Sequence, residues 1–147
     1  MGIDAMGQVV VAARIENLRD LYDAEKGVLP PEQVRAVDVA DALVDTGATM
    51  LSLPRRLIAQ LGLKCRRTRT ARTTAGVATF PIHEAVRLTV QGRDCLVEVA
   101  EIPDSCPVLI GQIPREALDF VVDPSGQRLI GNPSHGGEQM IDLFAAH

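Results

Sequence analysis

Residues 43–49 read Leu-Val-Asp-Thr-Gly-Ala-Thr, and this stretch determines how we interpret the rest of the chain. Two apolar residues lead into the core, and Asp45 follows them directly. A buried carboxylate is costly unless it is paired, hydrogen-bonded or protonated. Thr46 offers a hydroxyl, and Gly47 lets backbone amides approach without a Cβ, so this loop can hold an acid in an apolar setting. On these four residues alone, a strand end closed by an Asx turn fits equally well.

The segments before and after this loop indicate short strands separated by turns. β-Branched residues predict a strand over Gln8–Ile15, and Val34–Val44 predicts two short strands around a turn at Ala40-Asp41. The polar stretch Asn17–Pro31 is interpreted as an excursion between strands. Pro54–Leu61 predicts a helix, because its apolar residues share one face and Gly62 suits a left-handed C-terminal position.

The second half of the chain continues this pattern. Thr73–Ile82 predicts a hairpin with Ala75-Gly76 at its tip. Further strands are expected at Ala85–Val90, Cys95–Ile102, Phe120–Val122 and Gln127–Ile130, with a short helix at Pro114–Leu118. Many short strands with few helices predict a mainly β fold.

A second motif, Val108-Leu109-Ile110-Gly111, is an apolar run that ends in glycine and precedes the short helix. With Asp45-Thr46-Gly47-Ala48 and the hairpin between them, this ordered set resembles the retroviral-type aspartic proteases (retropepsins) and their bacterial single-lobe relatives. The resemblance implies a closed barrel, a single pepsin-type lobe with one or two short helices. It places the protease domain at residues 8–132, between a disordered or vector-derived N-terminus at 1–7 and a C-terminal tail at 133–147.

The resemblance also implies roles for individual residues. Asp45 matches the catalytic aspartate, Thr46 the residue whose hydroxyl joins two loops across a dimer axis, and Gly47 the close-approach glycine. The implied substrate-binding residues are Ala48, the flap tip Thr74, Ala75, Gly76 and Val77, and the supporting segment Leu109, Ile110 and Gly111. Viral members form an ion pair between an aspartate and an arginine where this chain has Thr49 and Gln112, so loop rigidity and interface detail are expected to differ.

Peptide hydrolysis of this kind needs two carboxyls, one ionised to take a proton from water and one protonated to stabilise the carbonyl oxygen. None of the other ten aspartates is followed by Thr-Gly or Ser-Gly, so the second carboxyl must come from a two-fold mate. We therefore expect a homodimeric aspartic endopeptidase that takes an extended peptide and needs no cofactor or metal. Apolar pockets are expected near Val44, Val77, Phe80 and Ile110. The alternative is a catalytically silent dimeric domain of the same fold that binds peptides or scaffolds partners.

Composition argues against several other classes of function. A chain of 147 residues predicts one domain, and no apolar run approaches the length of a membrane span. A net charge of −4, no Trp, one Tyr and three Phe argue against a nucleic-acid binder. Three cysteines without C-x-x-C spacing and scattered histidines support neither a disulfide framework nor a zinc site. Reduced thiols then indicate a cytoplasmic protein.

The sequence allows more than one interpretation of two segments. The basic stretch 64–72 is either a solvated strand face or a patch that favours acidic residues flanking the cleavage site. The apolar end, residues 140–144, is an interface strand, a self-substrate or a loosely ordered terminus.

Overall fold

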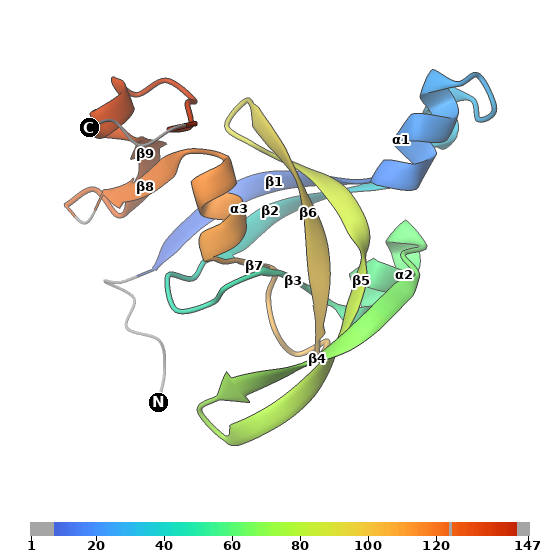
Figure 1. Ribbon diagram of the computed structural model, residues 1–147, viewed down its shortest axis with the longest axis horizontal. Helices are drawn as coiled ribbons and strands as arrows, with labels where there is room; N and C mark the ends of the chain where they lie inside the picture. The colour runs from blue at the N-terminus through green and yellow to red at the C-terminus, as the bar shows by residue number, and fades with distance from the viewer. Residues whose placement is uncertain (1–7, 124, 144–147) are drawn as a thin grey trace.

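The structure is a computed structural model that describes residues 8–123 and 125–143, so the N-terminal stretch 1–7 and Phe144 lie outside the described residues. Seven strands form one sheet in the order β1-β2-β7-β3-β6-β5-β4 (Figure 1). Their bounds are β1 (Val9–Asn17), β2 (Ala36–Val44), β3 (Leu51–Pro54), β4 (Cys65–Thr73), β5 (Gly76–Val90), β6 (Arg93–Ile102) and β7 (Leu109–Ile110). Strand β1 also pairs with β5, so every strand of this sheet except β4 has at least two partner strands. The predicted mainly β fold is confirmed.

A smaller two-stranded sheet follows the main one along the chain. It joins β8 (Phe120–Asp123) to β9 (Arg128–Gly131) in antiparallel register, as the turn residues between them predict. It lies on the same side of the molecule as helix α3 (Gln112–Ala117), away from the β4–β5 hairpin (Figure 1).

The described chain has three α-helices, one more than the upper number expected. Helices α2 (Arg55–Leu61) and α3 match their predictions to within two residues, and Gly62 closes α2 with a φ of 65°. Helix α1 (Leu18–Glu25) lies within the excursion that was expected between strands at Asn17–Pro31, where no helix was predicted. The Asn17 side chain caps α1 by accepting a hydrogen bond of 2.9 Å from the Asp20 amide. Because Asp20 is the buried residue of this helix, α1 has no buried apolar stripe to reveal it.

Strand β2 is continuous over Ala36–Val44, where two strands around a turn were expected. Its partner β1 pairs Val11 with Ala42 and Ala13 with Val39, so one residue of β1 faces two of β2. The Ala40-Asp41 signal therefore marks a β-bulge and not a chain reversal.

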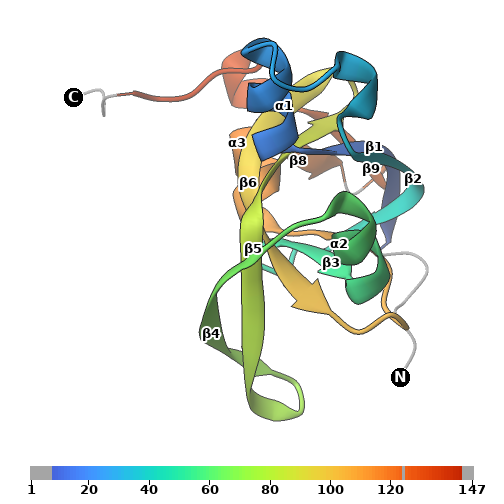
Figure 2. The same ribbon diagram turned by 90° about the vertical axis from the view of Figure 1, so that its right-hand side faces the viewer.

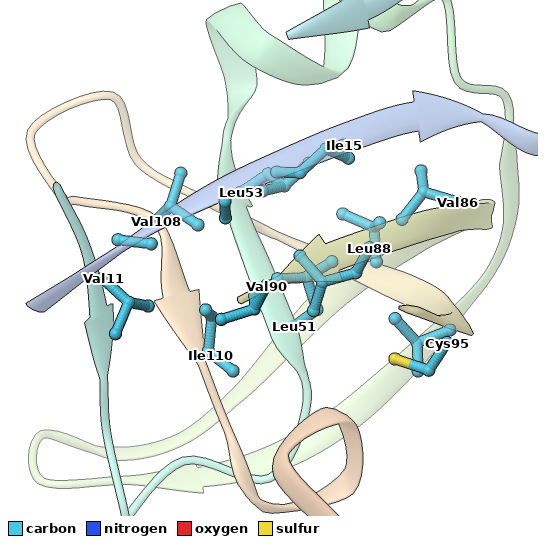
Figure 3. Close-up of a cluster of buried hydrophobic side chains, with 14 of the residues drawn as sticks. Val11, Ile15, Leu51, Leu53, Val86, Leu88, Val90, Cys95, Val108 and Ile110 are labelled. Atoms are coloured by element: carbon cyan, nitrogen blue, oxygen red, sulfur yellow. The ribbon is translucent and has the colours of Figure 1, made fainter. Parts of the chain in front are cut away.

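Apolar side chains from both halves of the chain meet on one face of the main sheet. Figure 3 shows residues of β1, β3, β5, β6 and β7 pointing into this shared core, including Ile15, Leu53, Leu88 and Ile110, each of them fully buried. We call the opposite side of the sheet the outer face. No described helix is both long and apolar enough to cross a membrane.

Candidate active site

The short strand β7 lies at the centre of the site. It runs parallel to β2, with Val44 opposite Ile110, and antiparallel to β3, with Leu51 opposite Ile110. Strands β2 and β3 are joined by the loop 45–50, so this loop passes over the end of β7 (Figure 1). Both ends of the loop are thereby fixed by the same buried residue, Ile110.

Backbone hydrogen bonds tie the loop to the segment that follows β7. The loop donates once and accepts three times across this contact. The bonds are Asp45 N–H to Ile110 O (3.0 Å), Gly111 N–H to Met50 O (3.2 Å), Gln112 N–H to Ala48 O (2.9 Å) and Ile113 N–H to Thr49 O (2.8 Å). Because main-chain groups make these bonds, the loop is positioned independently of its side chains.

Gly111 allows this close approach. A Cβ at this buried position would lie 2.6 Å from the Met50 carbonyl oxygen, well inside van der Waals contact. The glycine of the second motif is therefore required by steric contact with the Asp45 loop. The supporting role that the resemblance implied for this segment has a clear geometric basis.

The Asp45 side chain is partly exposed at the end of β2. Its Oδ1 accepts a hydrogen bond of 2.9 Å from the Gly47 amide, and its carbonyl accepts one of 3.1 Å from the Ala48 amide. These bonds form a tight turn in which Thr46 and Gly47 are exposed. In the part of the chain that the structure describes, Asp45 forms no ion pair. One protomer thus presents a carboxyl that is held in place but not enclosed.

The positions of the viral ion pair have a different arrangement in this chain. Thr49 is exposed, and the Gln112 side chain donates to Glu116 on its own helix at 3.3 Å. The amides of Gln112 and Ile113 instead hold the loop through its carbonyl groups. Backbone bonds therefore connect loop and helix at the place where the viral members use charges.

The predicted hairpin is present and is longer than expected, because β4 begins at Cys65. Its tip is Thr74-Ala75, where the Thr73 hydroxyl donates to Gly76 O at 2.8 Å and accepts from the Ala75 amide at 3.2 Å. Gly76 has a φ of 117°, which only glycine adopts without strain. Val77 beside the tip is 73% exposed. Figure 2 shows the hairpin projecting from the body of the molecule.

The two faces of the sheet separate residues that the sequence had grouped together. Val44 and Ile110 belong to the buried core, so in one protomer they cannot line a surface pocket as expected. Their neighbours Leu43 and Leu109 are Cα partners on the outer face. The same outer row continues across the sheet through Ser52, Ala100 and Ile82. Sequence reasoning missed Leu43 because two adjacent apolar residues do not show which one faces the core.

Two histidines without an assigned role make specific contacts. His83 is buried, and its Nε2 lies 2.9 Å from Glu101, whose other oxygen accepts from Arg55 at 3.1 Å. The Nδ1 atom of His135 lies 2.6 Å from the Asp119 carboxylate. Within residues 8–123 and 125–143, no group of three or more His, Cys, Asp or Glu side chains is arranged to hold a metal ion.

Comparison with known proteins agrees with this geometry. A family model described as gag-polyprotein putative aspartyl protease matches residues 35–113, more than half of the chain. The matched residues include β2, the loop 45–50, the β4–β5 hairpin and β7. No curated protein matches the chain.

Proposed function

Because the chain belongs to the retropepsin-like family of gag-polyprotein aspartyl proteases, we propose that it is an aspartic endopeptidase whose active form is a homodimer. The observation that carries this proposal is the Asp45 loop. A partly exposed carboxyl without an ion-pair partner in the described chain sits on a loop fixed by the backbone of residues 110–113. Such a carboxyl is held in one position and is accessible for proton transfer.

In the proposed mechanism, the two Asp45 carboxyls of a dimer share one proton. Like charges in contact cannot both ionise, so the proton belongs to the pair. The ionised carboxyl takes a proton from a water molecule as that water attacks the scissile carbonyl carbon. The protonated carboxyl donates a hydrogen bond to the carbonyl oxygen and stabilises its developing negative charge. The C–N bond of the resulting tetrahedral intermediate then breaks, and the nitrogen leaves with the proton that was taken from the water.

The incomplete surroundings of Asp45 support the dimer. Thr46 and Gly47 are exposed beside it, and two hollows of the described surface lie away from the loop. One hollow lies between β1, β2 and β5 beside Thr89, and the other lies between α1 and the sheet beside Glu84. A second copy would cover the exposed loop and supply the second carboxyl, with Thr46 at the contact.

We propose that the outer face beside the loop binds the peptide. Leu109 on this face is partly exposed, next to the buried Leu43. Leu43 lies two residues before Asp45, and Leu109 lies two residues before Gly111. The exposed tip residues Thr74–Val77 would close over an extended peptide, whose backbone pairs with the protein while alternate side chains enter apolar pockets. In this assignment Leu109 contacts substrate, whereas Ile110 and Gly111 position the Asp45 loop.

The test compares Asp45→Asn with the wild type on a mixed peptide library at several pH values. Asp41→Asn is the matched control, since Asp41 is an exposed aspartate on the same strand. We expect acid-favoured cleavage that Asp45→Asn lowers by at least about a thousandfold and that Asp41→Asn leaves unchanged. The retained oligomeric state of Asp45→Asn, measured by light scattering, excludes unfolding as the cause.

Two outcomes contradict the proposal. If dimeric wild-type protein binds library peptides without cleaving them, the silent peptide-binding domain becomes the better description. If Asp45→Asn and the wild type cleave equally, the activity resides elsewhere on the protein.

A further inference from the structure

The β4–β5 hairpin has an unusual charge for this chain. Residues 65–82 contain four arginines and no acidic residue, although acidic residues outnumber basic ones by four over the whole sequence. Strand β4 is exposed along almost its whole length, and the hairpin projects from the body (Figure 2). The arm that would close over a bound peptide is therefore strongly positive.

The four arginines are not equivalent. Both Arg67 Nη atoms donate to Glu98 on β6, so its charge is already matched within the chain. Arg66 borders the hollow beside α1, which also contains Glu84 and Glu98. Across the described residues, Arg66, Arg69 and Arg72 take part in no ion pair. Of these three, Arg69 and Arg72 also lie outside the hollow that contains Glu84 and Glu98, and we call them the free arginines of the arm.

The register of the hairpin places these two free arginines on opposite faces. Arg69 is the Cα partner of Phe80, whereas Arg72 is the partner of Val77. Side chains alternate along a strand, so Arg69 and Phe80 share a face with Arg67 and Ile82 two residues further along. That face continues through Ala100 and Ser52 to Leu109, which makes it the outer face. Arg72 points to the other side.

We propose that Arg69 binds the carboxylate of an acidic substrate residue that flanks the scissile pair. This inference rests on the proposed function, because it places the peptide on the outer face. Of the two free arginines, only Arg69 lies on that face, where it is exposed and its neighbour Phe80 is partly buried and apolar. Guanidinium matches a carboxylate with two parallel hydrogen bonds, and a peptide bound over the arm would shield such a pair from solvent.

The distance along the hairpin assigns the acidic residue to a flanking position. Arg69 precedes the tip residue Thr74 by five positions, which corresponds to about 16 Å of extended strand. If the tip covers the scissile bond, Arg69 reaches residues several positions away on one side. The two-fold mate supplies the same arginine on the other side, so the substrate class is a peptide with apolar residues at the cleavage site and Asp or Glu on both flanks.

The experiment uses the full chain and a decapeptide library with Phe-Leu fixed at the centre and all flanking positions randomised. Products are sequenced by mass spectrometry for the wild type, Arg69→Gln and the control Arg72→Gln, which removes the same charge from the opposite face. We expect enrichment of Asp and Glu on both flanks, with a preference in kcat/KM of about fivefold to tenfold over Gln. Arg69→Gln removes this preference, Arg72→Gln keeps it, and Arg69→Glu selects Lys or Arg instead.

A binding measurement separates this inference from the proposed function. The same library is panned on the Asp45→Asn protein with Arg69 intact or replaced by Gln, so the readout needs no cleavage. If the wild type cleaves nothing but acidic flanks are still selected through Arg69, the catalytic proposal fails and the specificity stands. If no acidic preference is found in either assay, or if Arg72→Gln reduces it as much as Arg69→Gln, the inference is overturned.

Discussion

Gly111 is the residue whose replacement tests the close packing behind the Asp45 loop. The added methyl group of Gly111→Ala would meet the Met50 carbonyl oxygen at 2.6 Å, and this oxygen belongs to backbone that cannot rotate away. We expect the free energy of unfolding to fall by about 1–3 kcal/mol, as for other overpacked sites. Peptide cleavage should fall further than stability, because the clash displaces the loop that holds Asp45. Urea unfolding and kcat measure the two effects.

Gly131→Ala is the matched control for Gly111→Ala. Gly131 also contacts backbone, since its Cβ would clash with the Gly137 carbonyl, but it lies in β9 far along the chain from the loop. We expect lower stability with unchanged kcat. Equal losses of kcat in the two variants would show that Gly111 acts through general stability and not through the loop.

The close packing behind the loop was predictable at Gly111, because a glycine that ends an apolar run indicates close backbone contact. The role of Asp45 stays a prediction: its four residues alone fit an Asx turn equally well, and the assignment came from the ordered set of motifs. The sequence could not show that Val44 faces the core and Leu43 the outer face, because both are apolar and the choice depends on the register with β7. Register is a property of pairing between distant segments, which one sequence does not display.

At the scale of elements, the fold was predictable where the local signals agreed with the packing. Helix α2 has its apolar residues Ile58 and Leu61 buried and ends at a left-handed glycine. Helix α1 depends instead on the Asn17 cap and on Asp20, which binds the Arg35 guanidinium at 2.8 and 2.9 Å. A helix that is fixed by polar contacts with a distant residue has no apolar period to reveal it.

His135 forms a polar clasp that holds the segment after β9 against the domain. Its Nδ1 lies 2.6 Å from Asp119 and its Nε2 lies 3.3 Å from Asp142, so both ring nitrogens face carboxylates. Asp119 also accepts a hydrogen bond of 3.0 Å from the Met140 amide. Arg93 donates to the carbonyl groups of Asp119 and Gly137 and lies 4.5 Å above the Phe120 ring. Carboxylates only accept hydrogen bonds, so the doubly protonated imidazolium is favoured.

The clasp predicts a defined pH window for the docking of this segment. Hydrogen bonds to Asp119 and then to Asp142 raise the pKa of His135 above its ordinary 6.5, so its stabilisation is complete below 6.5 and lost as pH rises through the raised pKa. The hydrogen bond from His135 lowers the pKa of Asp119 below 3.8, so that contribution is lost only as pH falls through the lowered value. Docking is therefore tightest between about pH 4 and about pH 6.5.

NMR tests this window directly. The His135 ring signals should titrate above pH 6.5, and the protection factor of the Met140 amide should fall across the same range. His135→Gln should remove the pH dependence, whereas Asp142→Asn should change little because Asp142 is 84% exposed. A His135 pKa at or below 6.5 would contradict the clasp.

Residues 133–143 form a short 3-10 helix and turns without a strand, so one protomer alone provides no terminal strand in this segment.

At the scale of the whole molecule, the dimer proposal predicts how activity depends on mixing. Each chain supplies one Asp45 loop, so a site made of one wild-type and one Asp45→Asn chain has a single acid where the mechanism needs two. Equal amounts of the two chains, unfolded together and refolded, should give about one quarter of the activity of the same total amount of wild type, because only matched wild-type pairs work. A monomer that acts alone would give about one half.

Refolding each chain separately and then combining them at once provides the control, since exchange has not yet occurred and about one half is expected from either mechanism. As subunits exchange, the activity of this combination should decay toward the lower value, and the rate of decay reports dimer dissociation. Dilution tests the same mechanism through a loss of specific activity near the dissociation constant of the dimer. Activity that stays at one half through prolonged exchange would assign the whole site, including the group that partners Asp45, to a single chain.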